Sequence, residues 1–175
     1  MKNDKGFTLI ELIVAVVVSV FASASIYLIL NLCFTQYKLV RCESQIMIEA
    51  QEITEKLKPV LMCCEYIKQQ NTEGATNKYT RIKSKDSEGN TKYYYLILSK
   101  QKLYLVTSNG HVNFSDLTWD SSNYMAQYVQ SIQFEPNVYE FRIDGKKDTI
   151  ECKVYLEEGG VSYDSSFKVR VRGKQ

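Results

Sequence analysis

The sequence predicts an α+β protein: one long N-terminal helix, whose first half spans a membrane and whose second half packs on an antiparallel β-sheet domain. Three observations predict this layout. An apolar run opens the chain, a helical spacing of apolar residues continues beyond it, and from residue 75 alternating strands are separated by turns. The predicted divisions are a short charged segment, a transmembrane helix, an amphipathic helical continuation and a β domain, at 1–6, 7–34, 35–70 and 71–175.

Residues 7–32 form the apolar run, and Glu11 is its only charged residue. A helix of about 26 residues at ~1.5 Å per residue is ~39 Å long, which exceeds the ~30 Å hydrocarbon core of a bilayer. The run can therefore cross a membrane with some tilt. Because Lys2 and Lys5 precede it, and a short Lys-bearing flank usually stays in the cytoplasm, the rest of the chain is expected outside.

A cleaved secretory signal is the alternative, since Ala22-Ser23-Ala24-Ser25 offers small residues of the kind found at signal cleavage sites. Glu11 argues against it. A carboxylate near the start of a membrane helix costs a few kcal/mol on insertion scales, so such an acid is by default a functional residue with a partner. The charge of Glu11 therefore indicates that the helix is retained in the mature protein and has a function there.

The segment Lys5-Gly6-Phe7-Thr8-Leu9-Ile10-Glu11-Leu12-Ile13-Val14 resembles the processing and methylation motif of type IV prepilins and pseudopilins. The match is almost residue for residue, although it covers less than a tenth of the chain. The resemblance implies that residues 1–6 are a leader peptide, and that a membrane aspartyl peptidase cuts after Gly6 and methylates the new amino terminus at Phe7. It also implies that Glu11 helps to position an incoming subunit in a fibre.

The charges at the expected new terminus favour contact between subunits. An α-amino group with a reference pKa of ~7.7 to 8.0 is mostly cationic at neutral pH, and that of Phe7 would lie at the positive end of its own helix dipole. This amino group therefore needs an anion from another subunit. Glu11, one turn into the helix, can supply that anion to the amino group of an adjacent helix. Gly6 suits a scissile bond because it has no side chain to hinder close backbone approach.

Two features of the apolar helix bear on the kind of subunit. Ala15, Ser19 and Ser23 recur every four residues, a stripe of small side chains that lets another helix approach closely. From Phe7 to Lys58 the helix contains no Gly or Pro, whereas many relatives carry a helix breaker in the apolar segment. The unbroken helix and Cys33 at its outer edge favour a minor or initiating subunit over the bulk one.

Beyond Leu32, apolar residues continue at steps of three and four and form a seam on one helix face. Pro59 removes the hydrogen bond to the carbonyl of Glu55 and is expected to kink or split the helix there. The helix should then resume to about Gln70 and stop at 71–74. The seam consists of Leu39, Cys42, Ile46, Ala50, Ile53, Leu57, Val60 and Cys64.

Alternating residues and turn signals predict a meander of antiparallel strands, one face of which accepts the amphipathic helix. Asn109-Gly110 predicts a two-residue hairpin that leads to a strand at 112–114. Residues 93–98 are apolar on both faces, which favours a central strand; an adhesive tyrosine patch is the alternative. The predicted strands are 79–83, 93–99, 103–107, 112–114, 129–135, 139–143, 150–154 and 167–171.

The last predicted strand directs Lys168, Arg170 and Arg172 outward, and Lys174 follows it. Alternating basic residues on a terminal strand usually form a solvated edge that blocks sheet-to-sheet aggregation, which is the favoured interpretation. DNA is the partner that is not favoured, because a net charge of +2 and a pI of ≈ 8.2 are too mild to indicate one. Binding that weakens steeply with salt, and disappears when these four residues become Gln, would revive it.

The five cysteines show no metal-ligand spacing. Cys63 and Cys64 are expected on different sides of the helix. One alternative is a disulfide between one of them and Cys152. The other is that all are plain thiols, as in a chain from a reducing or anaerobic setting. The odd number leaves at least one thiol free or intermolecular. The remaining two are Cys33 and Cys42.

Catalytic and metal-binding motifs are not found in the sequence. His111 is the single histidine and adjoins a turn, so a nucleophile with a histidine base would have to be built around it. Asp144, Asp148 and Asp164 lie near turns without the spacing of a calcium loop. An enzyme is the least favoured class, and no cofactor or metal is expected.

The resemblance thus implies a structural subunit, favoured as a minor pilin, of a type IV pilus-like fibre. A pseudopilin of a type II secretion or DNA-uptake machine is the first alternative, and a membrane-anchored binding domain that does not polymerise is the second. The expected partners are other pilin subunits, a prepilin peptidase, a pilus or secretion assembly platform and, before assembly, membrane lipid. The expected location is a single pass through the cytoplasmic membrane, N-terminus inside, followed by an extracellular or envelope-spanning fibre.

Overall fold

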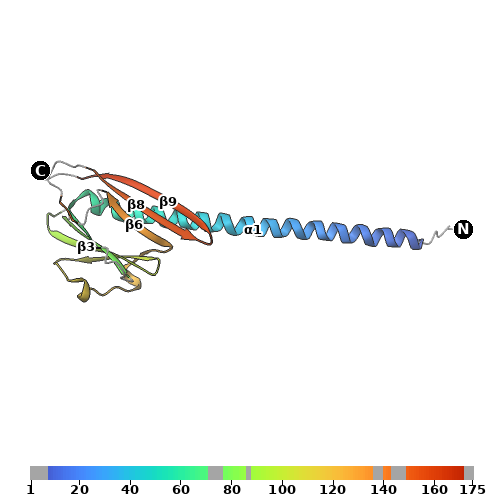
Figure 1. Cartoon of the computed structure of the whole chain (residues 1–175), viewed down its shortest axis with the longest axis horizontal. Coiled ribbons are helices and arrows are strands. Elements are labelled where there is room, and N and C mark those ends of the chain that lie inside the picture. The colour runs from blue at the N-terminus through green and yellow to red at the C-terminus, as the bar shows by residue number, and fades with distance from the viewer. Residues whose placement is uncertain (1–7, 71–76, 86–87, 136–139, 143–148, 172–175) are drawn as a thin grey trace. The chain divides into compact units, whose positions relative to one another are not determined.

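The computed structural model describes residues 8–70, 77–85, 88–135, 140–142 and 149–171. The chain divides into two units, 1–41 and 42–175. The first unit contains the early part of a single helix, α1 (Leu9–Met62), and the second contains the rest of α1 and all strands. Figure 1 shows these elements. The α+β layout predicted from the sequence, a long helix with its end packed on antiparallel strands, is confirmed.

The predicted seam on α1 is confirmed from Ile46 to Val60, whereas Leu39 at its start is 42% exposed and Cys42 is not fully buried. Within the second unit, the helix side chains that are buried recur at steps of three and four, because such positions stack on one face of an α-helix. The opposite face stays in solvent, with Met47 47% and Ile48 65% exposed. The buried helix residues are Ile46, Ala50, Ile53, Leu57, Val60 and Leu61.

The expectation that the helix resumes to Gln70 is wrong. The helix continues through Pro59 and ends at Met62, and Cys64–Gln70 forms strand β1. Pro59 cannot donate to the carbonyl of Glu55, which weakens the last turn. The following residues gain more as a strand, since Ile67 pairs with Ile82 of β2 (Asn77–Lys85) and both side chains enter the core. Cys64 therefore lies on a strand, not on the helix.

The strands form two antiparallel sheets instead of one meander. The larger has the order β5-β4-β3-β2-β1-β7, where β3 is Thr91–Ser99, β4 Lys102–Ser108, β5 Tyr124–Ala126 and β7 Glu140–Arg142. Its centre includes β3, as predicted. Both faces of β3 are buried: Leu96 and Leu98 face the helix-containing core, whereas Tyr95 and Ile97 face a second cluster.

The smaller sheet has the order β6-β8-β9, formed by Val129–Glu135, Thr149–Glu158 and Val161–Arg170. Alternate side chains of β8 are buried, namely Ile150, Cys152, Val154 and Leu156. β8 and β9 are joined by Gly159 and Gly160, whose φ angles of +57° and +81° suit the tight turn that matches strand twist.

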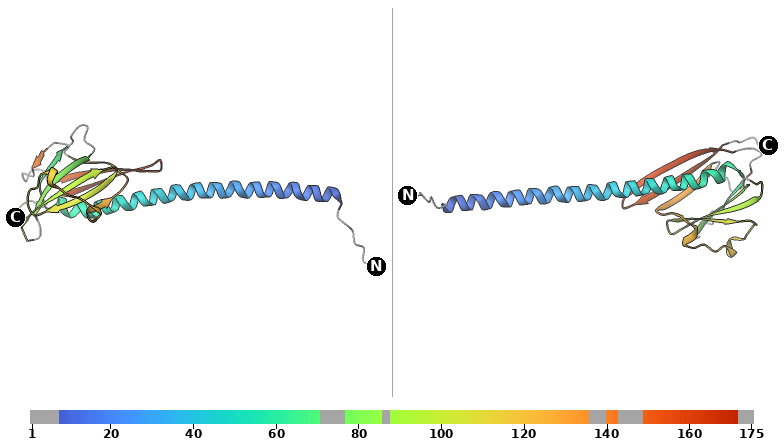
Figure 2. Two further views of the ribbon diagram at one scale, coloured as in Figure 1. Left: turned by 90° about the horizontal axis from the view of Figure 1, so that it is seen from below. Right: turned by 180° about the vertical axis from the view of Figure 1, so that it is seen from behind.

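One hydrophobic core unites both sheets with the end of α1. It contains Ile53 and Leu57 from the helix, Leu96 from the larger sheet, and Phe134 and Cys152 from the smaller. Figure 1 shows β8 and β9 drawn across this part of α1, and the reverse view in Figure 2 shows the helix in front of the same strands. The helix thus covers one face of the three-stranded sheet and leaves the other face open.

The predicted hairpin at Asn109-Gly110 is wrong. After β4 the chain forms two short 3₁₀ turns, η1 (Phe114–Asp116) and η2 (Ser121–Asn123), and β5 then pairs with β4. The Tyr95 hydroxyl accepts a hydrogen bond from the Val112 N–H at 2.8 Å and donates one to the Val112 carbonyl at 3.0 Å. These bonds satisfy backbone groups that a hairpin strand would have used.

This connection covers the second hydrophobic cluster, on the face of the larger sheet opposite α1. Leu117 from the connection packs with Tyr95, Ile97 and Val106. Phe114 stacks on Tyr79 with ring centroids 4.3 Å apart and lies 5.7 Å from Trp119. Because Tyr95 is 1% exposed, the core interpretation of the tyrosine-rich strand is correct for its central ring, and the adhesive-patch alternative is not supported there.

Candidate functional site

The start of α1 is held by three hydrogen bonds between Thr8 and Glu11. Carboxylate oxygen Oε2 of Glu11 accepts from the Thr8 backbone N–H at 2.8 Å and from the Thr8 hydroxyl at 2.9 Å. The Glu11 N–H in turn donates to Thr8 Oγ1 at 3.4 Å. This is a capping box, which satisfies backbone donors that the first helical turn leaves unpaired. The carboxylate therefore has partners within its own chain.

Sequence reasoning identified Glu11 but missed Thr8. A threonine followed three residues later by a glutamate, just before an apolar run, is the usual sequence pattern of a capping box. The pattern was present at Thr8 and Glu11 and could have been used. Gly6 and Phe7, the predicted cleavage and methylation residues, lie outside the described residues. In the sequence, Phe7 directly precedes the capping threonine.

The first part of α1 exposes its apolar side chains on every side. The helix contains an 18-residue window with a mean hydropathy of 2.6, none of which is buried, so it is long and apolar enough to cross a membrane. Leu9 is 78% exposed, Phe21 71% and Leu28 67%. A continuous apolar surface of this kind marks a segment that contacts lipid or other protein.

The small-residue stripe has its polar groups satisfied within the helix. The Ser19 hydroxyl donates to the Ala15 carbonyl at 2.7 Å, and the Ser23 hydroxyl donates to the Ser19 carbonyl at 2.8 Å. Serines that bond backward in this way expose little polarity toward an apolar environment. The stripe is compatible with close helix packing, which stays a prediction.

The comparison with protein families gives one match. Residues 1–27 match the family model described as the prokaryotic N-terminal methylation motif. These residues include the glycine, the phenylalanine, the capping threonine and the glutamate. No curated protein and no solved structure matches the chain.

Over these 27 residues, the chain is similar to type IV prepilins and pilin-like proteins. The methylation motif and the long apolar helix together support membrane anchoring, processing by a prepilin peptidase and later assembly with other pilins. Proteins of this pilin-like kind are in general structural and not enzymatic.

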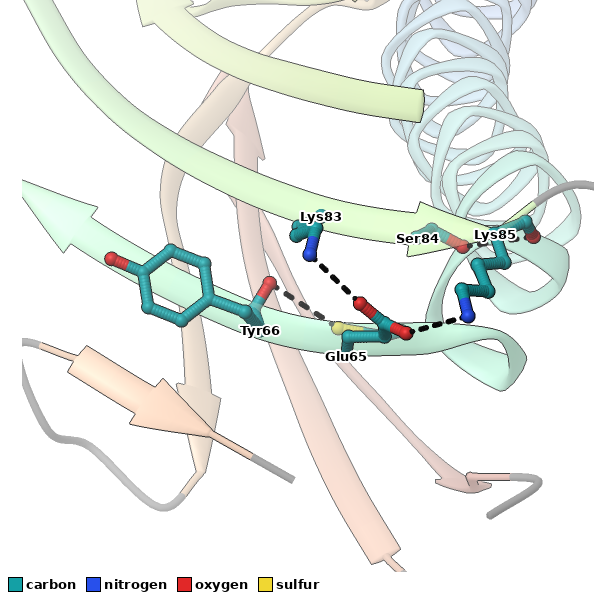
Figure 3. Close-up of polar contacts among 6 residues, drawn as sticks. Glu65, Tyr66, Lys83, Ser84 and Lys85 are labelled. Atoms are coloured by element: carbon teal, nitrogen blue, oxygen red, sulfur yellow. Dashed lines mark hydrogen bonds and ion pairs between the residues drawn. The ribbon is translucent and has the colours of Figure 1, made fainter. Parts of the chain in front are cut away.

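An ion-pair network fixes the start of β1, the strand that replaces the expected helix. Figure 3 shows the Glu65 carboxylate between the ammonium groups of Lys83 and Lys85, at 3.0 and 3.3 Å. The hydrogen bond from Lys83 and the second one from Lys85 hold the pKa of Glu65 below its ordinary value. Next to Glu65 in the chain, the Cys64 thiol donates to the Tyr66 carbonyl at 3.4 Å.

The five cysteines of the chain are free thiols. Cys64 and Cys152 are buried in the main core, and Cys63 is exposed. Burial raises the pKa of Cys64 to about 12 and also raises that of Cys152. Of the two alternatives for the cysteines, the structure therefore agrees with plain thiols, and Cys64 and Cys152 are neutral, unreactive core residues.

A half-buried carboxylate connects α1 to the strands. Glu49 accepts a hydrogen bond from the Gln127 N–H at 3.0 Å, in the link between β5 and β6. Burial raises the pKa of Glu49, and the bond from Gln127 acts in the opposite direction. This contact fixes the helix against the connection between the two sheets.

The residues considered for DNA, catalysis and metal binding have ordinary surroundings in the part of the chain that the structure describes. Lys168 pairs with Glu151 at 3.5 Å, as expected for a solvated edge, and Arg172 and Lys174 lie outside the described residues. His111 lies beside the Arg81 guanidinium on the surface. Among the described residues, no group of three His, Cys, Asp or Glu side chains could hold a metal ion. Asp144 and Asp148 fall outside them.

Proposed function

We propose that this prepilin-like protein is a structural subunit, favoured as a minor pilin, of a type IV pilus-like fibre. Residues 1–6 would be removed by cleavage after Gly6, and Phe7 would become the methylated amino terminus. The observation that carries the proposal is the methylation motif at the head of an exposed apolar helix whose capping box holds Glu11 in place. The helix would insert with its leader in the cytoplasm and then pack with other pilins.

The geometry of the capping box supports a role for Glu11 both in the membrane, before assembly, and in the assembled fibre. Both donors of Thr8 bond to the same carboxylate oxygen, Oε2. Oxygen Oε1 has no partner among the described residues and can accept from the cationic amine of a neighbouring Phe7. A carboxylate that keeps its intrachain bonds in lipid and gains a charge-assisted bond on assembly is never left without partners. Glu11 and Phe7 would thereby set the axial register of subunits.

The proposal predicts that Glu11→Val inserts into the membrane and is cleaved but enters fibres poorly. Removing one partner of a buried charged pair typically costs about 3 to 5 kcal/mol, because the other charge stays unpaired. Immunoblots of sheared fibres and of membranes measure both properties in one strain. Normal incorporation of the variant would contradict the assembly role, and Gly6→Val, which should stay uncut, serves as the processing control.

The alternatives differ in where the processed chain accumulates. A pseudopilin of a secretion or DNA-uptake machine would need the same cleavage and the same Glu11 but would remain in the envelope. An anchored binding domain would need neither. The minor-subunit assignment rests on the absence of Gly and Pro between Leu9 and Lys58, and on the single uninterrupted helix that follows from it. The ratio of this chain to other pilins in sheared fibres tests that assignment.

A further inference from the structure

The open face of the three-stranded sheet holds a hollow of about 340 Å³. Six polar side chains on this face line it in two neighbouring rows. Across the strands, Ser131 pairs with Tyr155 and Tyr155 with Asp164 in one row. Gln133 pairs with Lys153 and Lys153 with Ser166 in the next. Strands lie about 4.8 Å apart and residues of one face recur at every second position, so the six form a compact grid.

The hollow lies away from the core. Cys152, Val154 and Leu156 of β8 are buried against the helix, so the alternate residues Lys153 and Tyr155 point to the opposite face. Figures 1 and 2 show that this face is the one not covered by α1. The site belongs wholly to β6, β8 and β9 and needs no contribution from the apolar part of the helix.

Five of the six side chains keep their hydrogen-bonding capacity free for a ligand. The hydroxyls of Ser131, Tyr155 and Ser166, the amide of Gln133 and the carboxylate of Asp164 make no hydrogen bond or ion pair with the part of the chain that the structure describes. Lys153 is different, because its ammonium group is held by Glu135 at 2.5 Å. The hollow therefore offers both donors and acceptors, grouped around one half-buried aromatic ring.

The charge of the hollow narrows the class of ligand. Lys153 is neutralised by Glu135, which leaves Asp164 as the charge without a partner among the described residues, so an anionic ligand is disfavoured. A divalent metal is disfavoured as well, since Ca²⁺ takes six to eight oxygen ligands and Asp164 is the single carboxylate lining the hollow. What fits is an uncharged molecule with many hydroxyl groups and an apolar face.

We propose that this hollow binds a neutral saccharide. The Tyr155 ring would pack on the C–H face of a sugar, since aromatic rings combine apolar area with low flexibility. Asp164 would accept from sugar hydroxyls in charge-assisted bonds, and Gln133, Ser131 and Ser166 would donate and accept around the rim. The volume lies at the lower end of the range of small-molecule sites, about 300 to 1,000 Å³, which suits a short saccharide.

The test uses the full chain in lipid nanodiscs, because detergents with sugar headgroups would compete. The probes are neutral mono- to tetrasaccharides of glucose, galactose, mannose and N-acetylglucosamine, screened by saturation-transfer NMR and then titrated by calorimetry. We expect at least one to bind. Tyr155→Ala and Asp164→Asn should each weaken its binding about tenfold, and Tyr155→Phe, which keeps the ring, should weaken it less than about threefold.

Glu157→Gln is the matched control for Asp164→Asn. Glu157 is an exposed carboxylate on the same face of β8 but does not line the hollow, so the variant should bind as the parent does. Absence of binding by every saccharide, or binding unchanged in both Tyr155→Ala and Asp164→Asn, would overturn the proposal. So would an oligolysine peptide that binds more tightly than any sugar, requires Asp164 and weakens steeply with salt. None of these outcomes depends on fibre assembly.

Discussion

At the start of α1, the Glu11 carboxylate lies against Thr8 of its own chain, so the residue expected to contact a neighbour is already engaged. The two hydrogen bonds to Oε2, at 2.8 and 2.9 Å, place the acid at the positive end of the helix dipole. This geometry lowers the cost of a charge that enters the membrane. In the proposed fibre, it would also fix the direction in which Glu11 faces the amine of another subunit.

Replacing Thr8 should loosen the first turn of α1. Thr8→Ala removes the hydroxyl donor and the capping acceptor, and such losses typically cost about 0.5 to 2 kcal/mol. In nanodiscs, amide hydrogen exchange at residues 9–12 should become faster. Thr8→Ser keeps the hydroxyl and should exchange as the parent does. Equal exchange in the parent and Thr8→Ala would show that the capping box does not hold this helix end.

Thiol labelling distinguishes the buried from the exposed cysteines. At pH 8 a maleimide should modify Cys63 in the native protein but not Cys64 or Cys152, because burial keeps both thiols protonated and inaccessible. Peptide mass spectrometry measures the modification at each site, and labelling in denaturant is the control. A Cys152 peptide joined to another cysteine by a disulfide would contradict the free-thiol structure.

At the scale of the elements, α1 has two different surfaces along one continuous helix. Its later part buries one face against both sheets, whereas the early part buries none of its apolar window. Burial of each large aliphatic side chain contributes about 1.5 to 3 kcal/mol. The stability of the β domain should therefore depend on the seam of α1 and be insensitive to the opposite helix face.

Two isoleucines on α1 test this directly. Ile53 is 0% exposed and Ile48 is 65% exposed, so the same substitution meets opposite environments. Ile53→Ala should lower the free energy of unfolding of the domain by about 2 to 5 kcal/mol, whereas Ile48→Ala should change it by less than about 0.5 kcal/mol. Urea unfolding followed by Trp119 fluorescence measures both. Equal effects at the two positions would contradict the packing of α1.

The sequence predicted those elements whose signal is local. The helix followed from the spacing of Ile46, Ala50, Ile53 and Leu57, and β3, β6 and β8 followed from apolar runs or alternation. The strand at Cys64–Gln70 was missed because its stability comes from pairing with β2 and β7, distant in sequence, and its residues continue a helical spacing. The loop at 109–123 was missed since the decisive contacts come from Tyr95.

The candidate sites likewise divide into those with a local sequence signal and those formed by long-range strand pairing. Glu11 could be found from one charge in an apolar run, and Thr8 could have been found from its spacing to Glu11. The hollow on the three-stranded sheet could not, because its side chains come together only through the register of three strands. The division of the strands into two sheets is likewise a property of long-range pairing.

At the scale of the whole molecule, the chain combines two units that require different surroundings. Residues 42–175 contain a closed core, whereas the unit at 1–41 exposes a helix of large apolar residues, among them Leu9, Ile10, Phe21 and Leu28. Leaving that surface in water would cost on the order of tens of kcal/mol, summed over its side chains. Lipid before assembly and other pilin helices afterwards are the surroundings that a prepilin-like helix has available.

Mass spectrometry of the amino-terminal peptide, in fibres sheared from cells and in washed membranes, tests whether the chain is a processed fibre subunit. We expect a peptide that begins at methylated Phe7 in the sheared fraction, at a low ratio to other pilins. The same peptide confined to membranes would favour a pseudopilin. A chain that begins uncut at Met1 or Lys2 in every fraction would show that it is not a processed subunit, and would favour the anchored binding domain.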